Sequence, residues 1–158
     1  MKGNAKLIDM LNEILTMELS GINQYFIHSK LCEHWGYERL AEKVRNESLS
    51  EMKHAEQVVD RILHLEGIPN LQRLDKIKVG DKVSDQLKAD LDLEVAAIGR
   101  FNKAIALAVE VGDNGSREML DEMLASEEEH LHWLESQLEL IKQLGEANYL
   151  AQQIHKSE

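Results

Sequence analysis

Apolar residues recur at three- and four-residue spacing along almost the whole chain, and this helical period limits the possible folds more than any other feature. The chain contains one Pro in 158 residues, and no stretch shows the strict alternation of apolar and polar residues that a half-buried strand needs. The pattern therefore predicts an all-α protein. Long helices are expected at about 5–34, 36–65, 83–111 and 116–144, with a short fifth helix in EANYLAQQI.

The connections between these helices predict the topology. Short turns join the first helix to the second and the third to the fourth, whereas a link of about residues 66–82 follows the second helix. A link of this length lets the third helix begin at the far end, as in four-helix bundles with one long crossover. No tract rich in Pro, Gly or Ser divides the chain, so residues 1–158 are expected to form one domain.

Composition narrows the classes of function. The formal net charge of -11 argues against a nucleic-acid partner, because phosphate binding needs an excess of Lys and Arg. The acidic surface suits a protein that attracts cations, and equally one that charge keeps soluble. A single cysteine, Cys32, forms no internal disulfide and is expected to be inert packing. Because no apolar run approaches the ~18 residues of a membrane span and the N-terminus lacks a signal-peptide core, a soluble, cytoplasmic protein is expected.

Carboxylates and imidazoles interrupt the apolar stripes that should face the interior of the bundle. The stripe of the second helix runs through Leu40, Val44, Glu47, Glu51, His54, Val58 and Ile62. Glu-x-x-His, which places both side chains on one helix face, occurs at 51/54, 127/130 and 129/132. An internal repeat selects the first two, since Glu18, Glu51 and His54 recur 76 residues later as Glu94, Glu127 and His130. Glu129 and His132 lie about 200° around the helix from Glu127 and are expected at the surface.

Four inward carboxylates and two imidazoles cannot form a dry core, because each unpaired buried carboxylate is costly. No Lys or Arg lies on the inner stripes near the six positions, so we expect metal ions. One Glu from each of two helices and Glu-x-x-His from each of the other two is the ligand set of carboxylate-bridged di-metal bundles. Such donors suit iron or manganese and leave zinc open. The expected bridges are Glu51 and Glu127, with Glu18 and His54 at one end and Glu94 and His130 at the other.

Tyr25 lies two helical turns beyond Glu18 on the same stripe, and its counterpart 76 residues later is Phe101. The hydroxyl that distinguishes the two is compatible with a hydrogen bond to a metal ligand or with a one-electron donor. A packed aromatic side chain with a satisfied hydroxyl explains it equally well.

At these residues the chain resembles bacterioferritin, the haem-containing branch of the ferritins, over nearly its whole length. The stretches that carry the resemblance are MKGN, INQYFIHS, EMKHAE, ILHLEGIPNLQ, SEEEHLHWLE and NYLAQQI. All six expected metal ligands fall on the ferroxidase-centre positions of that family. The resemblance implies a ferritin-like bundle, a hollow shell of 24 subunits, oxidation of Fe(II) by oxygen or peroxide at a di-iron centre, and a ferric mineral stored inside.

The resemblance also implies a haem b bound between two twofold-related chains by one methionine from each, here Met52. Periodicity alone would make Met52 part of a packed interface, since it points about 100° away from Glu51. It shares a second, weakly apolar face of its helix with Val44, Ser48, Ala55 and Val59. The first helix has a matching face in Leu19, Ile22, Asn23 and Phe26. Exposed in a monomer, such faces predict a partner.

Some positions depart from the pattern of certain members of the family. Asn46 and Ser50 stand where those members have a His and an Asp that form an additional iron site on the inner surface, so this site is not expected here. Iron is then expected to reach the cavity through the centre, with His130 as a movable ligand. The lateral pore would be formed by His34, Glu66, His132 and Glu139, and the charging of its two His below about pH 6 is expected to oppose iron uptake.

The resemblance further suggests a ferredoxin-type reductant for iron release and leaves open assembly with a second ferritin subunit. Other classes fit less well. A rubrerythrin-type peroxidase usually carries a Cys-x-x-Cys segment, which one cysteine excludes, and a manganese catalase is expected to be longer. Starvation-type mini-ferritins hold their metals between subunits, and a non-catalytic helical interaction protein would not explain six inward ionisable groups that repeat at one offset.

Overall fold

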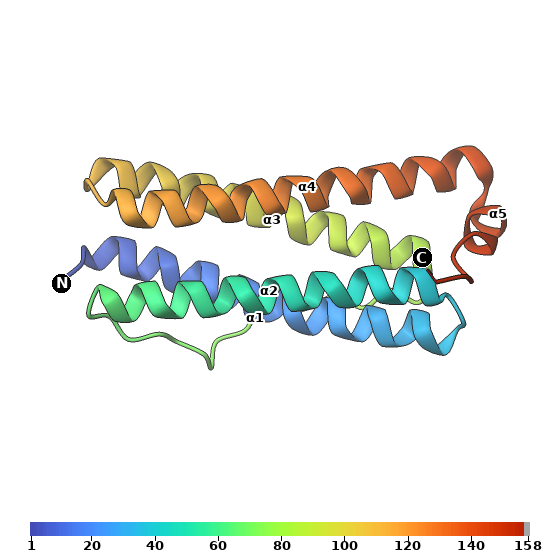
Figure 1. Cartoon of the computed structure of the whole chain (residues 1–158), viewed down its shortest axis with the longest axis horizontal. Helices are drawn as coiled ribbons and strands as arrows, with labels where there is room; N and C mark the ends of the chain where they lie inside the picture. The colour runs from blue at the N-terminus through green and yellow to red at the C-terminus, as the bar shows by residue number, and fades with distance from the viewer. Residues whose placement is uncertain (157–158) are drawn as a thin grey trace.

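The computed structural model describes residues 1–156, and this part of the chain folds into five α-helices without a strand. The helices are α1 (Ala5–His34), α2 (Glu38–His64), α3 (Val83–Glu110), α4 (Asn114–Leu144) and α5 (Glu146–Ala151). The first two form one antiparallel hairpin and the next two another, and α5 lies at the end of the bundle where α4 ends (Figure 1). The predicted all-α four-helix bundle with a long crossover and a short fifth helix is confirmed.

Local signals fix where the long helices begin and end. Asn4 caps α1 and Asp113 caps α4, each by accepting a backbone N–H with its side-chain oxygen. Arg61 of α2 donates to Asp113 at 2.6 Å, so this cap also ties the first hairpin to the second. Beyond α2 the chain reverses at Glu66, which adopts a left-handed φ of 62°.

The crossover link between α2 and α3 runs along the outside of the bundle (Figure 1). Three polar side chains of α1 accept backbone N–H groups of this link, and they are Ser20, Gln24 and His28. Because Nε2 of His28 accepts the N–H of Gly80 at 3.1 Å, its Nδ1 carries the proton and donates to Asp90 of α3 at 2.9 Å. The link therefore has a defined path, which returns the chain to the start of α3.

Two apolar clusters fill the bundle and leave a polar layer between them. One cluster joins the first half of α1 to the second half of α2, with Leu11, Ile62 and Phe101 among its fully buried members. The other lies toward α5 and includes Cys32 and Tyr149. Burial raises the pKa of Cys32 to about 12, as expected for an inert packed thiol. No helix among residues 1–156 is both long and apolar enough to cross a membrane.

Candidate metal centre

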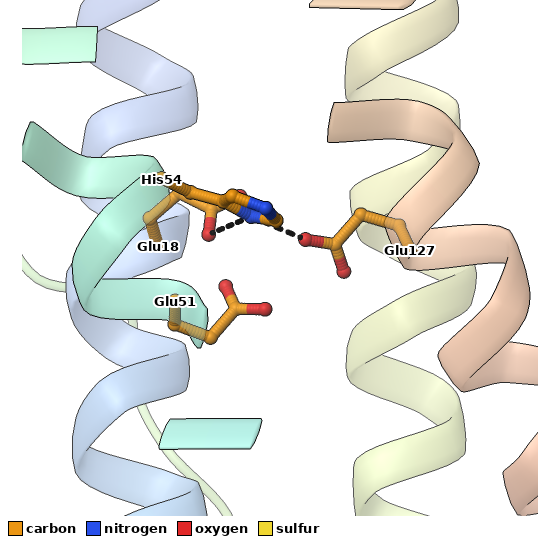
Figure 2. Close-up of side chains that lie close together, drawn as sticks. All are labelled: Glu18, Glu51, His54 and Glu127. Atoms are coloured by element: carbon orange, nitrogen blue, oxygen red, sulfur yellow. Dashed lines mark hydrogen bonds and ion pairs between the residues drawn. The ribbon is translucent and has the colours of Figure 1, made fainter. Parts of the chain in front are cut away.

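Three carboxylates and one imidazole converge in the polar layer, and Figure 2 shows their side chains pointing toward one another. Glu18 comes from α1, Glu51 and His54 from α2, and Glu127 from α4; each offers one ligand atom, and these atoms lie within 4.8 Å of one another. His54 Nδ1 lies 3.4 Å from Glu18 Oε2 and 3.2 Å from Glu127 Oε1. Four of the six side chains expected from the repeat thus form one cluster.

The two remaining side chains of the repeat contact each other in the same layer. Nδ1 of His130 lies 3.0 Å from Oε1 of Glu94, and both residues are buried. The hydroxyl of Tyr25 donates a hydrogen bond to the same oxygen of Glu94, and the Tyr25 ring meets His130 edge-on, with 5.2 Å between ring centroids. The structure therefore contains the hydrogen bond to a candidate ligand that was one of the alternatives for Tyr25.

The carboxyl groups of the layer resist ionisation in the metal-free chain. Burial raises the pKa of Glu18 well above its usual range, and the charges of Glu127 and Glu94 raise it further. Burial and Glu127 raise the pKa of Glu94 to about 8. The pKa values of Glu51 and Glu127 are also raised, again mainly by burial. Burial lowers the pKa of His54, but the carboxylates of Glu127 and Glu51 outweigh it and leave a raised value.

Some carboxylate oxygens of the layer have nothing to bind. Neither oxygen of Glu18, nor Oε2 of Glu94, has a hydrogen-bond partner among the described residues, although all three are buried. Such groups are rare in folded proteins because each one loses its hydration without compensation. Divalent cations would neutralise the carboxylates and give these oxygens a ligand at once. The donor set, oxygens with two imidazoles, therefore fits two metal ions, and the assignment of the six residues as ligands is a prediction.

A glycine makes room for one of the expected bridging carboxylates. A Cβ at Gly21 would lie 3.2 Å from Oε2 of Glu51, so a larger residue at this position of α1 would press on the carboxylate. Sequence reasoning missed this residue, because a glycine inside a helix carries no direct mark of what packs over it.

Three further side chains around His130 were also missed as part of the site. Oε2 of Glu47 lies 3.4 Å from His130 Nδ1, and Nζ of Lys43 lies 3.0 Å from Oε1 of Glu47. The Trp133 ring stacks on His130 at 22°, with 6.0 Å between centroids. Glu47 stood on the polar-interrupted stripe, but its counterpart in the repeat is Met123. Although no Lys lies on the stripes themselves, Lys43 reaches the layer from beside one, which only side-chain geometry reveals.

The expected haem-facing residues occupy an exposed apolar face of α1 and α2. Met52 and Phe26 are about half exposed, at 47% and 51%, Leu19 and Ile22 are partly buried, and Asn23 is exposed. Met52 and Leu19 line a pocket of about 310 Å³ together with Leu71 of the crossover link.

This second face of α2 is narrower than predicted. Val44, Ser48 and Ala55 are buried within the chain itself, because α1 packs over this part of α2, and the Ser48 hydroxyl donates to the carbonyl oxygen of Ile22 at 3.0 Å. Among the predicted members, Met52 is exposed and Val59 is partly buried.

The residues expected near the shell surfaces lie outside the core. All four candidate pore residues are exposed, and they are His34, Glu66, His132 and Glu139. Asn46 is exposed and Ser50 partly so. Glu129 is exposed like its neighbour His132, which agrees with the expectation that this third Glu-x-x-His pair lies at the surface. One subunit does not test whether these residues line a pore.

The bundle and its buried layer of carboxylates and imidazoles define a ferritin-like protein, and a family model described as Ferritin-like domain matches residues 8–144. Relatives named bacterioferritin align over almost the full length. The protein from Mycobacterium leprae is 47% identical over 152 residues, which cover 96% of each chain. Bacterioferritin BfrA of Mycobacterium tuberculosis is 45% identical with the same coverage, and bacterioferritin of Streptomyces coelicolor is 44% identical over all of this chain and 95% of its own. The chain belongs to the bacterioferritin family.

Proposed function

We propose that this protein stores iron and acts as a ferroxidase, with Fe(II) as the substrate of the polar layer. The observation that carries the proposal is the set of buried carboxylate oxygens without hydrogen-bond partners, which belong to a ligand set repeated at one offset and converging from four helices. Membership of the bacterioferritin family agrees with iron as the metal. A closed apolar core would gain nothing from retaining four carboxyl groups with raised pKa values.

Each residue of the layer has a defined task in this function. Glu18 with His54 holds one Fe(II), Glu94 with His130 holds the other, and the carboxylates of Glu51 and Glu127 bind both ions. Two Fe(II) ions give one electron each to O₂, which takes up two protons and leaves as H₂O₂, or they reduce peroxide instead.

Three features of the chain support this chemistry. Neutralisation by Fe(II) releases the protons that burial keeps on the carboxyl groups. The Tyr25 hydroxyl orients Glu94 through its hydrogen bond and is a candidate one-electron donor. The apolar clusters on both sides of the layer limit the access of water.

We assign the exposed apolar face to a twofold contact within a shell of 24 subunits. The residues around Met52 fit a haem b held between two chains, because a half-exposed thioether lies beside an apolar pocket of about 310 Å³. Met52 of each chain would be the axial ligand, and the haem would supply a route for electrons that reduce stored iron. The ring would pack on the face that carries Leu19, Ile22, Asn23 and Phe26.

The remaining assignments extend the same proposal. Electrons for iron release come from a ferredoxin-type reductant, the site of action is the cytoplasm, and a second ferritin subunit is a possible shell partner. The lateral pore includes His34, Glu66, His132 and Glu139, and its two imidazoles oppose cation uptake once they are charged. Because Asn46 and Ser50 offer no imidazole or carboxylate, iron passes to the cavity through the centre.

The proposal is tested on protein purified from cells by size exclusion with light scattering, with haem absorbance and iron content recorded across the same peak. A shell of 24 subunits with bis-methionine haem bands and iron far above two ions per chain is expected. Glu18→Ala should abolish rapid Fe(II) oxidation, whereas Glu129→Ala, at the exposed Glu-x-x-His pair, should not. A dimer or tetramer that holds two metals per chain without mineral would overturn storage and favour a soluble di-metal oxidase or peroxidase.

A further inference from the structure

The two halves of the candidate centre are not equivalent, although the chain repeats their ligands. The repeat places Glu47 opposite Met123, which is 1% exposed and packed in an apolar cluster. It also places Tyr25 opposite Phe101. The half formed by Glu94 and His130 thus gains a third carboxylate and a hydroxyl that the other half lacks.

The half with the extra carboxylate also adjoins a pocket. His130 and Glu47 line a space of about 380 Å³ together with Lys43 and Trp133. The side chain of Glu47 is 15% exposed, and its two oxygens face in different directions, one toward His130 and one toward Lys43. Glu47 is therefore the carboxylate that lies between the buried layer and the pocket.

Lys43 is held at this position by two partners. Its ammonium lies 3.0 Å from Oε1 of Glu47 and 5.1 Å from the centroid of the Trp133 ring, within the range of a cation–π contact. Trp133 in turn stacks on His130. A fixed positive charge thus sits on the pocket side of a candidate metal ligand, beside a carboxylate that would otherwise attract a metal ion.

We propose that Lys43 and Glu47 form a charge gate that makes the Glu94 and His130 half the exchangeable half of the centre. This inference rests on the proposed function. The ammonium compensates the charge of Glu47 and repels a cation bound at His130, so this half holds its ion less tightly than the half of Glu18 and His54. An ion that moves between the centre and the pocket displaces Lys43 and uses Glu47 as its first carboxylate on that path.

The gate predicts opposite effects of its two members on the weaker of the two metal affinities. Lys43→Gln removes the repulsion and leaves Glu47 uncompensated, so this dissociation constant should fall about tenfold. Glu47→Gln leaves the ammonium uncompensated and should raise the same constant about tenfold. The double variant should return close to the wild type, and Lys43→Arg should retain the wild-type value because it keeps the charge. The tighter dissociation constant should stay within about twofold in all four variants, since its ligands lie in the other half.

The test is an anaerobic titration of the assembled, metal-free protein with Co(II), followed through ligand-field absorption. His54→Ala and His130→Ala identify which dissociation constant belongs to which half. Release of Co(II) to a chelator is then timed, and the faster phase should slow in Lys43→Gln. Lys53→Gln, which removes the same charge from the exposed side of α2, is the matched control and should change neither constant.

The outcomes separate this inference from the function on which it rests. Wild-type protein that binds fewer than two Co(II) per chain would overturn both. Two bound ions with equal affinities, or a weaker affinity that Lys43→Gln and Glu47→Gln shift in the same direction, would overturn the charge gate alone. Opposite shifts that cancel in the double variant and persist with Lys43→Arg as wild type would establish it.

Discussion

Glu18 is the residue at which stability and function conflict most directly. Its side chain is fully buried, burial raises its pKa well above the usual range, and neither oxygen has a hydrogen-bond partner among residues 1–156. Glu18→Met should therefore stabilise the metal-free protein by about 1–2 kcal/mol, as replacement of buried charged groups often does, while it removes one metal site. Urea denaturation of chelator-treated protein measures the first effect and Co(II) titration the second.

The matched control is Glu129→Met, which changes an exposed carboxylate and should alter neither quantity. A metal-free Glu18→Met protein that is less stable than the wild type would show that the carboxyl group has partners in solution which compensate its burial.

Tyr25 offers a second test at this scale, because the repeat supplies its own control in the fully buried Phe101. Tyr25→Phe should cost about 1 kcal/mol of unfolding free energy through loss of the hydrogen bond to Glu94. It should also slow Fe(II) oxidation in stopped-flow absorbance. Unchanged oxidation together with the stability loss would restrict Tyr25 to packing.

Single residues were predictable from the sequence where the repeat marked them. Glu18, Glu51 and His54 recur with their counterparts at one offset, and the burial of all six agrees with their place on inner stripes. Lys43 and Trp133 carried no such mark. Their contacts combine a long side chain on α2 with a ring on α4, and helical period contains no information about which surface residues of two helices reach each other.

At the scale of elements, the start of α3 depends on a close approach by the end of the crossover link. A Cβ at Gly80 would lie 2.4 Å from the backbone nitrogen of Gln86, and backbone atoms cannot move aside cheaply. Gly80→Ala should therefore lower the unfolding free energy by about 2 kcal/mol or more. Gly99 lies within α3 with nothing inside 4 Å of its Cβ position, so Gly99→Ala should raise it by about 0.5–1 kcal/mol. Thermal unfolding of both variants measures the contrast, and equal effects would contradict it.

The helices were predictable because their apolar spacing repeats over seven or more turns, so errors at the ends leave the assignment intact. The path of the crossover link was not. It is fixed by side chains of α1 that accept link N–H groups, such as His28 with Gly80, and polar residues on a helix do not announce a partner so distant in sequence. The same limit explains why Ser48 seemed available for a partner chain, although it bonds to α1.

At the scale of the whole molecule, the face around Met52 separates haem binding from assembly. Leu has nearly the volume of Met but no sulfur, so Met52→Leu should retain the shell while it loses haem. Absorbance in the haem bands and light scattering on the same peak measure the two properties. Loss of the shell in Met52→Leu would instead make this residue part of the contact itself, and retained haem would exclude Met52 as its ligand.

The metal-free molecule should lose stability as pH rises, in contrast to many proteins with paired carboxylates. In the folded chain the pKa of Glu94 is raised from 4.5 to about 8, so above pH 4.5 the unfolded chain has released a proton that the folded chain still holds. Unfolding then releases protons, and the free energy of unfolding falls as pH rises from about 4.5 to about 8. His54 acts in the same direction, because its raised pKa contributes stability below pH ~6.5 that is lost as pH rises through the folded value.

Metal ions should reverse this slope. The carboxyl groups must lose their protons to bind a cation, so affinity for a divalent metal rises with pH and the bound state gains stability over the range in which the metal-free state loses it. Unfolding free energies at pH 5, 6, 7 and 8, measured with chelator and with saturating Co(II), should therefore diverge by on the order of a few kcal/mol. Parallel curves would mean that the metal does not bind at the titrating carboxyl groups, and would thereby separate the polar layer from the iron chemistry proposed for it.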